Sequence, residues 1–301
     1  MGAVVQLKSD RARARLLPAA GGRVSALRLE PQGGGDVVDV LHPYPEDFFD
    51  PLRWAKGGIY PLLPYSNRIA QARLQVAGTE VALLPHPDAA PHTLHGNAHA
   101  LPWRVQAHAA ASAVLVLDAS ASAAWPWHYG CSMRLRLSSC ALSVDLSIRN
   151  HDDRVMPAGL GLHPYFRHRP DARLQYCASA FWPPTPEFIA VASRAPTPDE
   201  NHAVARPLRA GGLTDYLGGW DGHASIELPD GERLQIDADP VFAHLVVHRP
   251  DNQAYLCLEP VSHVADGFNL AARGVLDTGA RWLAPGEALT GSMRFSLRAP
   301  A

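Results

Sequence analysis

The chain has 301 residues and nearly balanced charge, with 27 Lys and Arg against 29 Asp and Glu. Hydrophobic residues make up 47% of it, which is enough for a large core and excludes a mainly disordered protein. Because no basic block is present, the sequence argues against a dedicated nucleic-acid binder or a protein of anionic membranes. No apolar run approaches the roughly 18 residues that a membrane crossing needs, and the first residues lack the apolar region of a secretory signal.

Cysteine usage and the absence of linkers bear on location and domain organisation. The four cysteines (Cys131, Cys140, Cys177 and Cys257) lie far apart and form no Cys-x-x-Cys motif. We expect them to be buried, reduced thiols, as is typical of a cytoplasmic protein. No polar, Pro/Gly/Ser-rich break divides the chain, so residues 1–301 are expected to form a single domain.

Hydrophobic and polar residues alternate with a period of two along most of the chain, which is typical of strands with one face in a core. In chain order, the pattern predicts a hairpin over 74–83, a strand over 113–117, hairpins over 133–148 and 226–236, and strands over 245–248, 255–258 and 293–297. No long amphipathic helix is evident, and 27 Pro and 24 Gly interrupt the chain too often for a helix bundle. The fold class predicted is therefore all-β, a large antiparallel β-sandwich.

Chemistry-bearing residues gather in four segments at expected strand ends or loops, where a β scaffold presents functional groups. These segments are 58–69 (GIYPLLPYSNRI), 92–103 (HTLHGNAHALPW), 159–166 (GLGLHPYF) and 257–269 (CLEPVSHVADGFN).

Metal and cofactor sites are the first alternatives to weigh. His92, His95 and His99 have a spacing that could supply metal ligands, but prolines and a glycine around them argue against a helix and no acidic residue is interleaved. We interpret these histidines as mainly structural and expect no metal. Motifs for a nucleophilic serine, a phosphate-binding loop or a dinucleotide site are also missing, so no cofactor is expected.

An acid/base pair without a cofactor remains, and His163 and Glu259 are the best candidates. His163 precedes Pro164 at the end of an apolar, Gly-rich run. Glu259 ends an apolar strand before Pro260, where partial desolvation would raise its basicity. Taken singly, each residue could instead be structural: a carboxylate paired with an arginine, or a buried, hydrogen-bonded histidine.

Together the segments resemble the aldose 1-epimerase (galactose mutarotase) family. The resemblance rests on five short motifs: Asn67-Arg68-Ile69, Leu94-His95-Gly96, His163-Pro164-Tyr165-Phe166, Leu258-Glu259-Pro260 and Leu283-Ala-Pro285-Gly286-Glu287. They occur in the family's order and at roughly its spacing over most of the chain. Each motif alone is weak evidence for the family, but five of them in the same order are strong evidence.

The resemblance implies an open sugar-binding cleft on a β-sandwich and a mutarotase that interconverts the α and β anomers of a free aldohexose. It implies that the carboxylate of Glu259 takes the proton from the anomeric hydroxyl and that His163 donates a proton to the ring oxygen. It further implies that Asn67, Arg68 and His95 hold sugar hydroxyls and the ring oxygen.

The sequence departs from the family's pattern in two places. An Asp that binds sugar hydroxyls is expected after the Pro-rich segment, where Asp215 is the nearest candidate but Thr214 stands at the expected position; Asp221 is a less favoured substitute. In the second departure, Asn97 follows Gly96 where a second glycine is common.

An aromatic platform for the sugar ring is also expected, and Trp220 is the first choice. Other conceivable platforms are Trp54, Tyr65, Tyr165 and Trp182. Trp103, Trp125 and Trp127 are expected to pack in the core.

Three other readings stay open. A hexose-6-phosphate mutarotase would need cations over the cleft, for which Arg53, Lys56, Arg73, Arg167 and Arg169 are available. A non-catalytic carbohydrate-binding protein of the same fold would not need the His163/Glu259 pair. Glycoside hydrolysis needs two opposed carboxylates, and only Glu259 is well placed. The partner expected is a small sugar, with no nucleic acid and no membrane.

Overall fold

The computed structural model describes residues 2–169 and 171–300, and its regular structure is almost entirely antiparallel β. Within these residues, the larger sheet has twelve strands. Along the main path of the sheet they are β14 (Phe166–Arg167), β20 (Tyr255–Val261), β19 (His244–Arg249), β17 (Leu213–Glu227), β18 (Arg233–Ala238), β22 (Ala288–Arg298), β11 (Ala141–Asn150), β10 (Tyr129–Leu137), β9 (Ser112–Ala119) and β8 (Arg104–Ala109). Off this path, β15 (Arg173–Trp182) pairs with β17, and β16 (His202–Pro207) pairs with β15.

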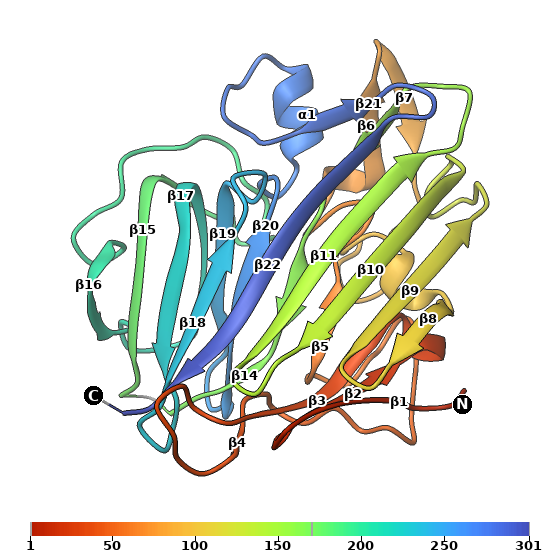
Figure 1. The fold of residues 1–301 in the computed structure, drawn as a ribbon. Coiled ribbons are helices and arrows are strands. Elements are labelled where there is room, and N and C mark those ends of the chain that lie inside the picture. The colour runs from red at the N-terminus through yellow and green to blue at the C-terminus, as the bar shows by residue number, and fades with distance from the viewer. Residues whose placement is uncertain (1, 170, 301) are drawn as a thin grey trace.

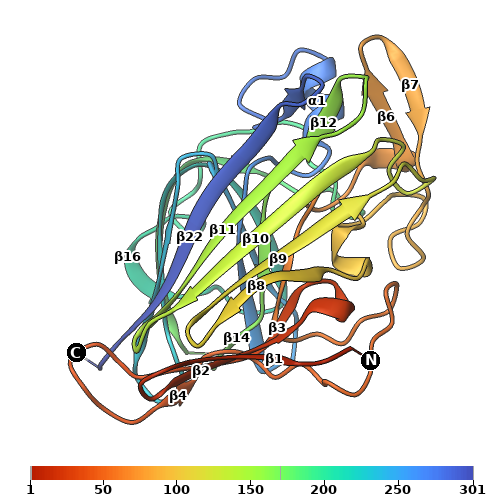
Figure 2. The same ribbon diagram turned by 45° about the vertical axis from the view of Figure 1, so that its right-hand side comes forward.

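A second sheet is built mainly from the N-terminal part of the chain. Its strands are β1 (Val5–Ser9), β2 (Ala12–Leu17), β3 (Arg23–Leu29), β4 (Val38–Asp39), β5 (Ile59–Pro61) and β13 (Leu162–Pro164). Figure 1 shows β1 to β3 crossing one end of the larger sheet, and the turned view in Figure 2 shows them beneath β8 to β11. The expected β-sandwich architecture is confirmed.

The remaining elements are short. They are the two-stranded pairs β6 (Arg73–Val76) with β7 (Thr79–Ala82) and β12 (Met156–Ala158) with β21 (Arg281–Leu283), the 3-10 turns η1 (Pro18–Ala20), η2 (Ala70–Ala72) and η3 (Ala98–Ala100), and the helix α1 (Gly267–Ala272). In the described part of the chain, no helix is long and apolar enough to cross a membrane.

Alternation along the strands explains why they form. In the β10–β11 hairpin, Met133 pairs with Leu146 and Leu135 with Val144, and all four are buried, whereas the intervening Arg134 is exposed. The predicted hairpins over 74–83 and 226–236, and the single predicted strands, are also present. Trp103, Trp125 and Trp127 are buried in the core as expected.

One expectation about the cysteines is wrong. All four are free, and Cys131 and Cys257 are buried, but Cys140 is only partly buried and Cys177 is exposed. Cys177 lies on β15 between the buried Tyr176 and Ala178, so the strand's alternation turns its side chain to the opposite face.

Candidate active site

A cavity of about 220 Å³ lies where β5 and β13 of the smaller sheet meet β17, β19 and β20 of the larger one. It is lined by Trp54, Lys56, Tyr60, Asn67, Arg68, Asp88, Leu94, His95, His163, Tyr165, Phe188, Thr214, Tyr216, Val246, His248, Tyr255 and Glu259. Five of the seven site residues expected from the sequence are in this set: Asn67, Arg68, His95, His163 and Glu259.

His163 and Glu259 come together at the meeting of the two sheets. His163 lies on β13 opposite Tyr60 of β5, and Glu259 lies on β20 opposite Val246 of β19. The Nε2 atom of His163 is 3.4 Å from Oε1 of Glu259, and the two side chains are only 7% and 3% exposed. The pair is therefore shielded from bulk water but borders the cavity.

Burial favours the neutral forms of both His163 and Glu259. It raises the pKa of Glu259 to about 8. The pKa of His163 lies well below its usual value, mainly because of burial and further because of the nearby cationic groups of Lys56 and Arg23. Near neutral pH the pair thus carries a single proton, which burial places on Glu259.

Stacked aromatic rings fix the imidazole of His163. The rings of Tyr60 and Tyr165 both pack against it, with centroids at 4.8 Å and 4.6 Å and interplanar angles of 27° and 13°, and they also contact each other with centroids 6.2 Å apart. Nδ1 of His163, Oε2 of Glu259 and the hydroxyl of Tyr60 are buried and have no hydrogen-bond partner among the described residues. Because unpaired buried polar atoms are costly, their grouping here indicates a site for a polar ligand.

The loops that carry Asn67 and His95 hold each other in place. The backbone N–H of His95 donates to the carbonyl oxygen of Asn67 at 2.8 Å, and the N–H of Asn67 donates to Nδ1 of His95 at 3.1 Å. Burial lowers the pKa of His95 well below its usual value, so the ring is neutral and carries its proton on Nε2. Gly96 permits this turn, since its φ is +67° and a Cβ atom would lie 2.3 Å from the carbonyl oxygen of Leu63.

Asn67 and Arg68 have further contacts, with β17 and with the segment that follows β15. The amide oxygen of Asn67 accepts from the hydroxyl of Tyr216 at 3.3 Å, and the guanidinium of Arg68 lies 4.8 Å over the ring of Phe188. Asn97, at the position of the second departure, is not among the cavity residues; its side-chain oxygen accepts from the hydroxyl of Tyr129 at 2.5 Å.

The expectation that Asp215 lines the site does not match the structure. Asp215 is buried on the other face of β17, where the guanidinium of Arg209 binds both carboxylate oxygens at 2.5 and 2.7 Å. Thr214 faces the cavity instead, and its hydroxyl lies 2.9 Å from Nδ1 of His248. Asp221, the substitute, is exposed and outside the cavity lining.

Trp220 is also misplaced by the sequence interpretation. Its ring belongs to the hydrophobic core that includes Leu217, and its Nε1 donates to the carbonyl oxygen of His223 at 2.9 Å. Gly219, with a φ of +57°, interrupts the regular alternation between Leu217 and Trp220. Of the other platforms considered, Trp54 and Tyr165 line the cavity, and the sequence interpretation missed Tyr60, Tyr216 and Tyr255.

Charges around the cavity are few and mixed. Of the five cations considered for phosphate binding, Lys56 lines the cavity, and so does the carboxylate of Asp88. Arg73, Arg167 and Arg169 are paired with carboxylates outside the lining set: Glu80, Asp230 and Glu227.

Possible metal ligands near the cavity do not form a suitable donor set. His163, Cys257 and Glu259 bring their ligand atoms within 4.8 Å of one another. Burial raises the pKa of the Cys257 thiol well above its usual value and that of Glu259 to about 8, so the anionic ligand forms are disfavoured. His92 accepts from the backbone N–H of Gln71 at 3.0 Å, which matches a structural role for this histidine.

Comparisons with known proteins show the family to which the chain belongs. The family model for aldose 1-epimerase matches residues 4–296. The uncharacterized protein YphB of Escherichia coli strain K12 is 30% identical over 243 residues, which cover 78% of this chain and 81% of YphB.

Solved structures share the fold over the full length. A crystal structure from Escherichia coli K12, assigned only provisionally as an aldose 1-epimerase, matches with a TM-score of 0.84 and 25% identity over 98% of this chain and 99% of its own. A GalM/aldose epimerase homologue from C. elegans matches with a TM-score of 0.82 and 15% identity, covering 100% of both chains. The chain belongs to the aldose 1-epimerase family.

Proposed function

We propose that this protein is an aldose 1-epimerase that interconverts the α and β anomers of a free aldohexose by acid/base catalysis at His163 and Glu259. The observation that carries the proposal is the pairing of these two side chains, 3.4 Å apart at the wall of a small polar cavity. Two oxygens share the anomeric carbon of a pyranose, the hydroxyl and the ring oxygen. An imidazole and a carboxyl at this separation can each serve one of them.

The reaction needs two proton transfers and no redox change. Glu259 as carboxylate takes the proton from the C1 hydroxyl, while protonated His163 gives its proton to the ring oxygen. The bond from C1 to the ring oxygen breaks and the C1 carbonyl forms. Rotation about the C1–C2 bond and the reverse transfers close the ring as the other anomer, so the protons balance over the cycle.

The single proton of the pair suits both half-reactions. Ring opening uses the form with the proton on His163, and ring closure uses the form with the proton on Glu259. Burial favours the second form in the free protein, since it disfavours separated charges. The first form needs only a proton shift between two atoms 3.4 Å apart.

Asn67, Arg68 and His95 are proposed to hold the sugar hydroxyls. His95 presents an Nε2–H donor, because its Nδ1 accepts a backbone hydrogen bond. Arg68 supplies a guanidinium, which suits oxygen-rich ligands. The tyrosine and tryptophan rings of the lining offer apolar faces against which a sugar ring can pack.

A free sugar is favoured over a 6-phosphorylated one. A phosphate dianion needs several convergent cations, whereas the lining has two, Lys56 and Arg68, together with the carboxylate of Asp88. The volume of about 220 Å³ corresponds to roughly seven water molecules, which favours a single small ligand.

The test is saturation-transfer NMR of anomeric protons over a panel of free and 6-phosphorylated aldoses. The proposal expects catalysed exchange with one or more free aldohexoses and little with their 6-phosphates. Exchange of a 6-phosphate alone would overturn the substrate class. Measurable sugar affinity without any catalysed exchange would support the carbohydrate-binding alternative and overturn the enzyme.

A further inference from the structure

A second group of convergent side chains lies away from the sugar cavity, on the solvent-exposed face of β9 and β10. Asp118 is near the end of β9, His128 comes just before β10, and His151 comes just after β11. Nε2 of His128 lies 2.9 Å, and Nδ1 of His151 3.2 Å, from the same oxygen of Asp118, Oδ1. The three potential ligand atoms lie within 4.8 Å of one another.

Gly130 makes this convergence possible. It pairs with Asp118 on one side and with Arg149 on the other, so it sits between β9 and β11 in the sheet. The ring of His151 lies directly over it, and a Cβ atom at Gly130 would come within 2.5 Å of Cε1 of His151. Since Gly130 has no side chain, His151 can cross β10 and reach Asp118.

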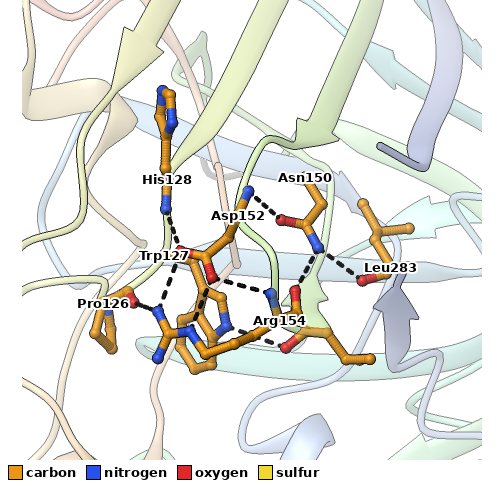
Figure 3. Close-up of polar contacts among 8 residues, drawn as sticks. Pro126, Trp127, His128, Asn150, Asp152, Arg154 and Leu283 are labelled. Atoms are coloured by element: carbon orange, nitrogen blue, oxygen red, sulfur yellow. Dashed lines mark hydrogen bonds and ion pairs between the residues drawn. The ribbon is translucent and has the colours of Figure 1, made fainter. Parts of the chain in front are cut away.

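The backbone of the two histidines is fixed by a hydrogen-bond network, part of which Figure 3 shows. The backbone N–H of His128 donates to the carboxylate of Asp152 at 3.1 Å, and the N–H of His151 donates to the carbonyl oxygen of His128 at 3.0 Å. Arg154 binds the Asp152 carboxylate, with Nε at 2.8 Å, and Asn150 accepts from the N–H of Asp152 at 2.9 Å. The loop is thus held in shape independently of the imidazole rings.

The ligand types and spacing suit a transition-metal cation. Imidazole nitrogens and a carboxylate oxygen are ligands that Zn²⁺ takes at about 2.0–2.2 Å, and tetrahedral sites with three protein ligands leave one position for water. Asp118 adds a carboxylate oxygen to the two imidazole nitrogens, so the group combines neutral and acidic ligand types. The three side chains border a groove of about 620 Å³, which leaves access for an ion and its water.

We infer that Asp118, His128 and His151 form a binding site for one divalent transition-metal ion, with Zn²⁺ as the best match. The site is separate from the sugar cavity, and no residue lines both hollows. Two cations border the groove, Arg104 and Arg149, and the guanidinium of Arg149 is directed to the carbonyl oxygen of Gly286. A bound metal would tie β9, β10 and the loop after β11 together and stabilise the native fold.

The test is isothermal titration of the full chain with ZnCl₂ after removal of metals by chelation and dialysis. The wild type is expected to bind one Zn²⁺, and saturating Zn²⁺ is expected to raise its Tm. His128→Ala, His151→Ala and Asp118→Ala each remove a ligand and should weaken binding by more than the roughly 10–100-fold that follows the loss of an outer-shell partner. Gly130→Ala, which leaves all three ligands in the sequence, should weaken binding because His151 is displaced.

His108→Ala is the matched control. His108 is an exposed histidine that does not belong to the proposed site, and its ring contacts the backbone oxygen of Gln6. The variant should keep both Zn²⁺ affinity and the Tm increase. Circular dichroism shows whether each variant is folded. The proposal is overturned if the wild type binds no Zn²⁺, or if folded His128→Ala, His151→Ala and Asp118→Ala variants bind it as tightly as His108→Ala does.

Discussion

His163 and Glu259 lie far apart along the chain, yet Nε2 of the one is 3.4 Å from Oε1 of the other, and both side chains are almost completely buried. The antiparallel pairings that produce this contact, of β13 with β5 and of β20 with β19, belong to different sheets. The pair therefore depends on the packing of the two sheets against each other. It is also the feature from which the proposed chemistry follows.

The first prediction concerns the carboxyl. Glu259→Gln keeps the shape of the side chain but removes its capacity to accept and return a proton. A positioned acid/base group contributes typically 10²–10⁴-fold, so kcat for anomer exchange should fall by about this factor. Saturation-transfer NMR measures the rate, and Glu80→Gln, which changes an exposed glutamate on β7, should leave it unchanged. A Glu259→Gln variant as fast as the wild type would show that Glu259 is not the base.

The second prediction concerns pH. The active pair holds one proton, and the pKa of Glu259 is raised to about 8. As pH rises through about 8 the pair loses this proton, so the rate of anomer exchange should decline above that value. Glu259→Gln should lose this alkaline limb from its residual rate. A wild-type profile that stays flat to pH 10 would contradict the single-proton pair.

The third prediction concerns stability. The pKa of Glu259 in the folded protein, about 8, lies above its ordinary value of 4.5, so between these pH values the unfolded carboxyl is ionised while the folded one is not. Folding stability from this group is therefore fully present below pH 4.5 and is lost as pH rises toward 8. The unfolding free energy of Glu259→Gln, relative to that of the wild type, should therefore rise by about 4 kcal/mol over this range, since one pKa unit corresponds to about 1.4 kcal/mol.

Urea unfolding at pH 5, 7 and 8.5 measures this difference. Glu80→Gln, with its carboxylate exposed, should differ from the wild type by the same amount at all three values. If the gap between Glu259→Gln and the wild type does not change with pH, the carboxyl of Glu259 is not desolvated.

The fourth prediction separates two neighbours on β17. Thr214 faces the cavity and contacts His248, so Thr214→Val should raise KM for the sugar with little loss of stability. Asp215 is buried and binds Arg209, so Asp215→Ala should lower the unfolding free energy by about 1–3 kcal/mol. Sugar kinetics at a temperature well below unfolding, together with urea titration, test both. The reverse pattern would mean that Asp215 contacts the sugar.

The sequence predicts the strands well because their signal is local. Each one repeats a polar and an apolar residue, as in the β10–β11 hairpin, and needs no knowledge of distant segments. Five of the seven predicted site residues line one cavity. Each of the five belongs to a short sequence motif that has a fixed position in the family's order. Their pairing in space could only be inferred through that resemblance.

Asp215 and Trp220 show where this reasoning stops. In a strand, a displacement of one residue moves a side chain to the other face of the sheet. Thr214 and Asp215 are neighbours on β17 near the cavity, but their side chains therefore point in opposite directions. Trp220 is shifted by the positive φ of Gly219, which no alternation pattern reveals. Tyr216, Val246 and His248 resemble ordinary strand residues in the sequence and become site residues only through the register of β17 with β19.

The fifth prediction tests the central claim, that His163 and Glu259 act together on one sugar. His163→Asn should slow anomer exchange strongly, though less than Glu259→Gln. Because the two groups exchange one proton, the account predicts that the double variant is about as slow as Glu259→Gln alone. Saturation-transfer rates for the wild type, both single variants and the double variant decide this directly. Two single-variant losses that multiply in full in the double variant would contradict a shared acid/base pair.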